Sequence, residues 1–391
     1  MSTEFLHGVR QTINQHGYTP MPMVATSVIG LLATGEEADA ELFPLDQAVL
    51  ITDIAEAIGK AGKSGTLKEA LEDIYKEAST AIVVIRVEEA DADEDTIANV
   101  MGDIVGDKRT GLEVFELAQQ QTGVQPKIFI CPKYDTTSSV RLKLANIAEK
   151  ARGFTYVSFD DCTTIADALK ARESFSSAYA MPVFNNALAY STVLKADAER
   201  YSVAQLAGLR ARLDQEKGWH WSISNNLLKE ATGATKEVTY SAINGYGTGA
   251  NTLNEKGISV FVRDDGGIKI WGNRTASEPD SSFYFEVFTR TSNFLAEEAA
   301  EYLRRSMQDK PLTRAVMEDF RLNYNNRLAD HKRAGRILGG QVILDPTKNG
   351  KDDLMQGRPD YELKFTPVPP AESPGIEITL TSDFINEIMG A

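Results

Sequence analysis

Hydrophobic residues between positions 50 and 160 follow two alternating periods. They recur at helical spacing over residues 51–58 and again over 67–75, which predicts two helices. The run Ala81–Val87 is almost continuously apolar, which is typical of a strand covered on both faces. The same reasoning predicts helices over 112–120 and 140–150 and strands over 23–32, 127–131 and 155–159. This alternation indicates βαβ units and a mainly parallel sheet.

The pattern changes after about residue 235. Alternating runs over 257–262 and 267–271 flank a hairpin-type turn at Asp264–Gly267, and 283–288 is a third strand candidate. Longer helical patterns cover 294–307 and 312–335. We therefore predict a multi-domain fold of α/β and α+β class. Its predicted parts are an N-terminal extended arm (1–22), an α/β region (23–235), an α+β domain (236–370) and a C-terminal extended arm (371–391).

Both ends of the chain have the character of extended segments. Residues 1–20 carry few apolar residues in helical register and lead into Pro20 and Pro22, while a proline-rich stretch precedes strict alternation over Ile376–Leu380. A lone strand is stable only where a sheet edge accepts it. We expect each arm to add a strand to the sheet of a neighbouring copy. The alternative is that both ends pair within their own subunit.

Composition and charge narrow the function classes. The chain has 391 residues and a formal net charge of −15, which argues against nucleic-acid partners and anionic membrane surfaces. Its first residues lack a secretory pattern, and no apolar stretch approaches the roughly 18 to 20 residues of a membrane helix. With only Cys131 and Cys162, no disulfide framework is implied, and a reducing cytoplasm is the expected setting.

The segment Ala57–Ser64 fits a relaxed phosphate-loop pattern. A true phosphate loop follows a strand, whereas the residues before this segment have helical periodicity. We interpret its glycines as the end of one helix, before a capping box of Thr66 and Glu69 opens the next. The alternative is a nucleotide-hydrolysing enzyme that uses Lys63 and Ser64.

Other candidates for chemistry are weaker. Cys131 and Cys162 follow predicted parallel strands, but the four histidines give no signature of a base for a nucleophile, so we expect core cysteines. The aspartates at 91, 93 and 95 lack the glycine and glutamate of a calcium loop. Trp219 and Trp221 could stack on a glycan, although packing is the commoner role. We therefore predict no catalytic residue, no cofactor and no metal site.

Residues 304–336 are basic in an otherwise acidic chain. They contain nine basic and four acidic residues, a net charge of +5. Such a helical region predicts either a docking surface for an acidic partner or an ordinary solvated face.

Several stretches together resemble the contractile tail sheath family of bacteriophages and phage-tail-like bacteriocins. The similar blocks, in order, are Phe5–Val9, Gly65–Leu67 with Ala81–Val87, Ala207–Asp214 with Gly218–Trp219 and Ser224–Asn226, Leu253–Ile258, Trp271–Thr275, and Pro367–Glu372. The family often has Asn-Thr-Pro before its last strands, whereas this chain has Asn349-Gly350-Lys351.

The resemblance implies a structural protein that forms a helical stack of hexameric rings around an inner tail tube. It implies assembly in the bacterial host cytoplasm, baseplate and tail terminator proteins as further partners, and contraction from a metastable extended state. It also implies that residues 23–235 lie outside and residues 236–370 lie nearest the tube.

The predicted site residues form three sets. The inter-subunit arms use Phe5, Leu6, His7, Gly8, Val9, Ile376, Ile378 and Leu380. The positions that match the family's motifs are Asp214, Trp219, Asn225, Leu253, Asn254, Trp271, Arg274, Pro370 and Glu372. The expected tube contacts are Arg327, Lys332, Arg333 and Arg336.

Overall fold

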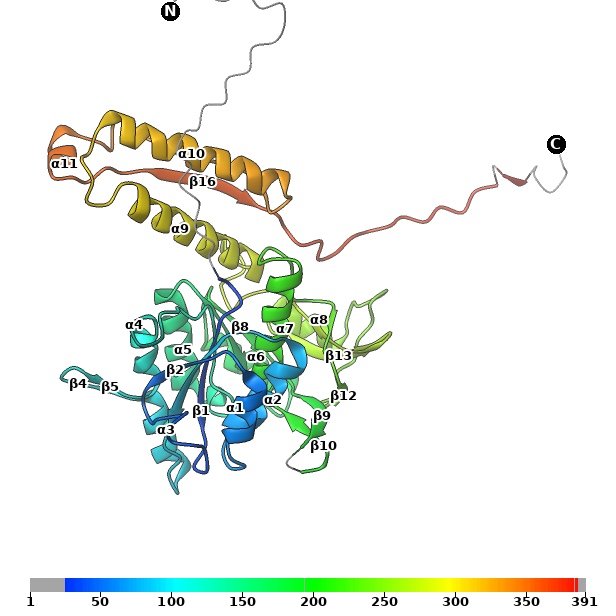
Figure 1. Cartoon of the computed structure of the whole chain (residues 1–391). Coiled ribbons are helices and arrows are strands. Elements are labelled where there is room, and N and C mark those ends of the chain that lie inside the picture. The colour runs from blue at the N-terminus through cyan, green and yellow to red at the C-terminus, as the bar shows by residue number, and fades with distance from the viewer. Residues whose placement is uncertain (1–24, 193, 383, 386–391) are drawn as a thin grey trace, which may run out of the picture. The chain divides into compact units, whose positions relative to one another are not determined.

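A computed structural model describes residues 25–192, 194–382 and 384–385 (Figure 1). The described chain divides into two compact units. The large unit comprises residues 27–290 with the described part of 368–391, and the small unit comprises residues 291–367 with residues 25–26. The predicted boundary between residues 235 and 236 falls inside the large unit.

A six-stranded sheet forms the centre of the large unit. Its order is β2-β3-β1-β6-β7-β8, and every neighbouring pair is parallel except β2 with β3. The strands are β1 (Ile29–Thr34), β2 (Ala48–Ile51), β3 (Ile82–Val87), β6 (Ile128–Ile130), β7 (Phe154–Ser158) and β8 (Ala180–Val183). The prediction of a mainly parallel sheet is confirmed.

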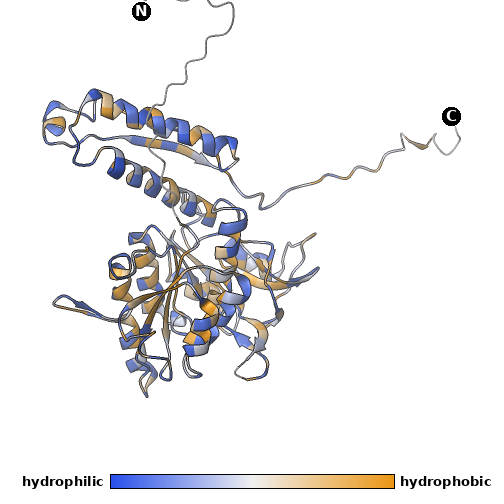
Figure 2. Ribbon diagram, in the orientation of Figure 1, coloured by the Kyte–Doolittle hydropathy of each residue, from blue (hydrophilic) through white to orange (hydrophobic). Residues whose placement is uncertain are grey.

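Helices cover both faces of this sheet, and alternation along β3 shows why. Ile82 and Val84 join the core that includes α2 and α7, whereas Val83 and Ile85 join the core that includes α5. Figure 2 shows the apolar character of these strands. The elements around the sheet are α1 (Ile54–Lys60), α2 (Leu67–Glu77), α3 (Asp93–Met101), α4 (Ala118–Thr122), α5 (Ser138–Lys150), α6 (Ile165–Glu173), α7 (Ser202–Glu216), α8 (Gly249–Glu255) and the 3₁₀ turns Gly111–Leu117 and Tyr134–Thr136.

Smaller antiparallel sheets complete the large unit. One has the order β10-β9-β12 and another the order β11-β14-β13. Their strands are β9 (Ala187–Ser191), β10 (Ala196–Arg200), β11 (Asn226–Leu227), β12 (Ala231–Ala234), β13 (Val260–Asp264) and β14 (Gly267–Trp271), and a separate hairpin joins β4 (Ile104–Val105) to β5 (Lys108–Arg109). The predicted hairpin at Asp264–Gly267 is confirmed. Phe261, Ile268 and Ile270 share the core of the central sheet, which is why this hairpin belongs to the large unit.

The small unit contains long helices and one two-stranded sheet. Helix α9 (Glu286–Ser306) begins in the large unit and continues into the small one. It is followed by α10 (Arg314–Arg333), β15 (Ile337–Ile343), α11 (Lys351–Met355) and β16 (Glu362–Pro367). Strands β15 and β16 pair antiparallel. Phe320 packs against Tyr302, Tyr324 and Tyr361. The rings of Phe320, Tyr302 and Tyr324 are buried and form the interior of the unit.

Four local predictions were wrong for identifiable reasons. Residues 283–288 form no strand: Phe285 makes only an isolated bridge with Arg274, and α9 begins at Glu286. The expected capping box does not form, because the Thr66 hydroxyl accepts a hydrogen bond from the Thr34 amide at 3.2 Å. Ile51 pairs with Ile82 in the sheet, so the first helix starts three residues later than expected. The helix over 112–120 is a 3₁₀ segment continued by α4.

Candidate functional site

The C-terminal arm, residues 368–382, has an extended course without strand pairing among the described residues. Ile376 and Ile378 are 87% and 85% exposed, and Leu380 is fully exposed. In an extended chain these alternate residues share one side, with Glu377 and Thr379 on the other. The arm therefore presents an apolar edge that no described residue of its own chain covers. The N-terminal positions Phe5–Val9 lie outside the described residues.

The base of this arm is attached to the large unit by an ion pair. Arg274 Nε and Nη2 donate to the two carboxylate oxygens of Glu372 at 2.8 and 2.7 Å. Both side chains are half-buried. Two positions that match the family's motifs, 98 residues apart in sequence, are thus brought together.

Strands β15 and β16 form a two-stranded sheet in the small unit. Within the described chain they pair only with each other, so their sheet has two outer edges. On β15, the Asn325 side chain accepts from the Val342 amide at 2.7 Å and donates to the Val342 carbonyl at 3.3 Å. One position of that edge is therefore occupied by a side chain of α10, which leaves β16 as the more open edge.

Four buried charges alternate in a closed ring in the large unit. Arg210 pairs with Asp214 at 2.9 Å and lies 3.7 Å from Glu286, and Arg290 contacts the same two carboxylates. The Tyr156 hydroxyl donates to Glu286 at 2.7 Å, and burial raises the pKa of Tyr156 well above its ordinary value. The ring joins α7 to the first turn of α9. It explains why residues 286–290 are helical rather than a strand.

A second buried cluster surrounds Arg200, and no sequence pattern predicts it. The guanidinium pairs with Asp73 at 2.8 Å and with Glu69 and Glu72 at 3.3 Å. Burial raises the pKa of Asp73 to about 7, against the lowering effect of Arg200. The spacing of the three acids on α2 was the available signal, but nothing in it indicated Arg200, which lies on β10.

The predicted tube contacts have different environments in the small unit. Arg327 binds the buried Glu298 at 2.7 Å, and His331 binds the same carboxylate at 2.9 Å. Lys332 and Arg333 are exposed, and Arg333 pairs with Asp330 on the same helix. Arg336 lies beside His331. Arg327 is thus part of the interior packing of the unit, whereas Lys332 and Arg333 are accessible.

The remaining positions that match the family's motifs have packing roles. Trp219 and Leu253 are buried, and Trp271 packs edge-on against Tyr240. Asn254 donates to the carbonyls of Ile258 and Trp271, and the Asn225 amide donates to the Ile270 carbonyl. Pro370 belongs to the arm.

The phosphate-loop lookalike is a turn between two helices. Helix α1 precedes it and α2 follows it, and Gly62 and Gly65 adopt left-handed backbone angles there. The Lys63 amide donates to Glu37 rather than pointing into an anion cradle. The geometry does not have the strand that a phosphate loop requires.

The described residues offer little else for chemistry. Burial raises the pKa of the Cys131 thiol well above its usual value and that of Cys162 to about 11, which keeps both protonated. No group of three or more His, Cys, Asp or Glu residues in the described chain could hold a metal ion. None of the described helices is long and apolar enough to span a membrane.

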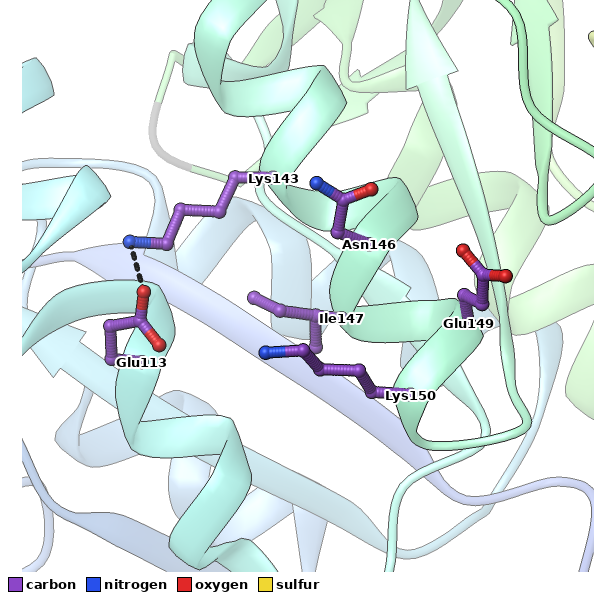
Figure 3. Close-up of a pocket in the computed structure, with 6 residues that line it drawn as sticks. All are labelled: Glu113, Lys143, Asn146, Ile147, Glu149 and Lys150. Carbon is purple, nitrogen blue, oxygen red and sulfur yellow. Dashed lines mark ion pairs between the residues drawn. The ribbon is translucent and has the colours of Figure 1, made fainter.

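Figure 3 shows a shallow pocket of about 280 Å³, crossed at one side by the ion pair of Lys143 and Glu113 at 2.6 Å. Its other lining residues are Asn146, Ile147, Glu149 and Lys150. The lining contains neither a nucleophile with a base nor converging donors for a phosphate. We assign it no chemical role.

Comparison with known proteins shows which chains are similar to this one. Residues 107–276 match the family model of the phage tail sheath protein central domain, and residues 26–87 match that of the tail sheath protein Gp18 domain III N-terminal region. The tail sheath protein of Escherichia phage P2 is 34% identical over 99% of this chain and 98% of its own length. The chain belongs to the phage tail sheath protein family. The major tail sheath protein of Serratia phage KSP20 is 36% identical over 99% of this chain and 97% of its own length.

Solved structures share the sheath fold. The contracted helical sheath of the anti-feeding prophage matches with a TM-score of 0.71 and 16% identity, over 97% of this chain and all of that chain. The contracted PVC sheath complex of an extracellular contractile injection system matches with a TM-score of 0.67 and 14% identity, over 98% of this chain and all of that one. These structures show that the chain has the sheath fold, and its membership of the tail sheath family makes it a structural subunit of a phage tail sheath.

Proposed function

We propose that this sheath subunit polymerises as a helical stack of hexameric rings around an inner tail tube. The stack contracts from a metastable extended state and drives the tube through the bacterial envelope. Baseplate and tail terminator proteins lie at the two ends of the stack. Assembly takes place in the cytoplasm of the bacterial host. Residues 23–235 contribute the outer part of the sheath, and residues 236–370 contribute the part nearest the tube.

The observation that carries this proposal is the exposed apolar edge of the C-terminal arm together with the open β15–β16 sheet. The arm needs a partner for its backbone N–H and C=O groups, and the sheet edge needs a strand. A strand over Ile376–Leu380 forms about four hydrogen bonds, each contributing about 0.5–1.5 kcal/mol, so one junction contributes a few kcal/mol. Because a donor edge and an acceptor edge lie on every copy, the contact is heterologous and propagates into an open helical polymer.

The energy for contraction comes from contacts between subunits, and no nucleotide is consumed. Interfaces with two packings supply the extended and contracted states, and a kinetic barrier holds the first. The arms keep neighbours connected while the packing changes. We infer that the subunit has no catalytic role, which is supported by the helix–turn–helix geometry around Lys63 and by the protonated core cysteines. A phosphate-loop enzyme has no observation in its favour.

The proposed tube contact is the exposed basic part of α10 and the residues after it. Lys332 and Arg333 are its accessible members, Arg336 is half-buried, and Arg327 supports the surface through Glu298. A basic surface on a chain of net charge −15 favours an acidic partner.

Deletion of residues 374–391 tests the arm. We expect a folded monomer with an unchanged melting temperature that forms no tubes, as followed by sedimentation and negative-stain microscopy. A matched pair of variants tests the apolar edge by itself. Ile378→Lys should block polymerisation, because it places a charge on the side of the arm that becomes buried against the neighbouring copy. Thr379→Lys, on the opposite side, should leave polymerisation intact. Tubes of normal appearance from the truncated protein would contradict the proposal.

A further inference from the structure

Arg274 is held in place by backbone hydrogen bonds on both sides. The Thr275 amide donates to the Tyr284 carbonyl at 2.8 Å, and the Glu286 amide donates to the Asn273 carbonyl at 3.0 Å. Arg274 itself forms a backbone bridge with Phe285. Its guanidinium therefore projects from a fixed point of the large unit.

Glu372 meets this fixed point with both carboxylate oxygens. Nε and Nη2 of Arg274 each donate one hydrogen bond, at 2.8 and 2.7 Å, and this two-point contact sets the orientation of Glu372 as well as its position. Past Glu372, Ile376, Ile378 and Leu380 are exposed. The ion pair thus marks the last anchored position before the apolar edge of the arm.

Prolines stiffen the chain on both sides of Glu372. Pro369 and Pro370 precede it and Pro374 follows it. Proline fixes φ and favours an extended course with a rise of about 3.1 Å per residue. At that rise, Ile376 lies about 12 Å and Leu380 about 25 Å along the arm from Glu372. The direction set at Glu372 is therefore carried as far as Pro374, and beyond Gly375 the short spacing limits how far the apolar edge can lie from the ion pair.

We propose that Arg274 and Glu372 form a clasp that sets where the C-terminal arm leaves its own subunit. Residues 368–371 are then a connection whose length is of no consequence for assembly. Residues 373–382 are the reach, and only their length and stiffness determine whether the apolar edge meets the sheet of the next copy. Arg274 and Glu372 act as positioning residues, without touching the neighbour. This proposal rests on the proposed function of the arm.

A charge swap tests the pair. Glu372→Gln and Arg274→Gln should each raise the protein concentration needed for polymerisation about fivefold, as expected for one half-buried two-point ion pair. The melting temperature of the monomer should change little, because the pair is partly screened by solvent and ties down only the arm. The double variant Arg274→Glu with Glu372→Arg should bring the polymerisation concentration most of the way back to that of the unmodified protein. Failure of the swap to improve on either single variant would contradict the clasp.

Insertions test the proposed division of the arm. A Gly-Ser pair inserted between Pro370 and Ala371 should leave the polymerisation concentration within about twofold of wild type. The same pair inserted between Ser373 and Pro374 makes the reach longer and more flexible, which lowers the effective concentration of the arm at its acceptor. This insertion should raise the polymerisation concentration about fivefold. In a Glu372→Gln background the two insertions should behave alike. Equal effects of the two insertions in the otherwise unchanged protein would overturn the proposal.

A measurement on the monomer separates the clasp from the function of the arm. Spin labels on cysteines replacing Lys256 and Ser373, both exposed, report the distance across the clasp, and the buried Cys131 and Cys162 remain unlabelled. We expect a narrow distance distribution that broadens with Glu372→Gln and in 1 M salt. A broad distribution in the unmodified monomer would remove the clasp. A narrow distribution, together with polymerisation of the truncated protein, would keep the clasp and remove the proposed role of the arm.

Discussion

Buried charges, rather than surface ones, determine the local conformation at residues 286–290. Glu286 and Arg290 are one helical turn apart, and both turn inward to Arg210 and Asp214. The apolar residues of Phe283–Phe288 dominate the local pattern and predict a strand. Arg210 and Asp214 also have the spacing of an ordinary surface pair. Their partners lie more than 70 residues away, so sequence spacing alone could not reveal the ring.

Replacement of one acid in this ring should be costly. Asp214→Asn leaves Arg210 and Arg290 with one carboxylate between them in a buried site, and we expect a loss of about 3–5 kcal/mol in the free energy of unfolding. Urea denaturation measures it. As a control, Glu56→Gln removes an exposed ion pair with Lys60 and should cost about 0.5 kcal/mol or less. Equal losses for the two variants would show that the ring does not stabilise the fold.

At the scale of elements, hydrophobic periodicity correctly predicts the helices and strands whose conformation tertiary contacts do not change. The helices α2 and α5, the strand β3 and the β13–β14 hairpin follow their patterns closely. Which elements pack against one another is determined by close packing, which the hydrophobic pattern does not contain. Gly208 on α7 faces α2, where an added Cβ would lie 2.8 Å from Glu77 Cβ, and periodicity does not reveal which helix takes that place. The same holds for the basic residues of the candidate tube surface, because the sequence does not distinguish Arg327, which pairs with the buried Glu298, from the exposed Lys332.

Charge reversal at different basic residues of α10 should therefore have different effects, on stability at Arg327 and on tube binding at Lys332. Arg327→Glu places a negative charge beside the buried Glu298 and should lower the free energy of unfolding by about 3 kcal/mol or more. Lys332→Glu changes an exposed side chain and should leave stability within about 0.5 kcal/mol. It should instead weaken co-assembly with the inner tube protein, most strongly at low salt. Thermal melting and co-sedimentation provide the two measurements. Unchanged co-assembly of Lys332→Glu would exclude that residue from the tube contact.

For the whole molecule, the sequence predicted the fold class but not the division into units. The change of composition after about residue 235 predicts a second domain that includes the β13–β14 hairpin. Its apolar side chains instead join the core of the central sheet, so the compact division falls at residues 290 and 291. Such a division depends on long-range packing, which no local pattern contains. The extended C-terminal arm was predictable because prolines and strict alternation are local signals.

A mechanism without nucleotide has a direct test. Lys63→Ala should leave tube formation and contraction unchanged, because Lys63 is exposed on a turn between α1 and α2. Calorimetry with ATP and GTP should show no binding to either protein. The variant Lys60→Ala, at the exposed last residue of α1, controls for loss of surface charge. Nucleotide binding by the unmodified protein that Lys63→Ala abolishes would instead support an enzyme.

The arm's exposed apolar edge creates a hazard for newly made copies. A segment with Ile376, Ile378 and Leu380 on one side can stack with identical segments and form off-pathway aggregates before any ring exists. Pro374 and Glu377 oppose this, because proline interrupts strand pairing and stacked carboxylates repel one another. Their value would lie in keeping the pool of newly synthesised subunits dispersed. Overproduction of a Glu377→Val protein should accordingly yield inclusion bodies in place of soluble material.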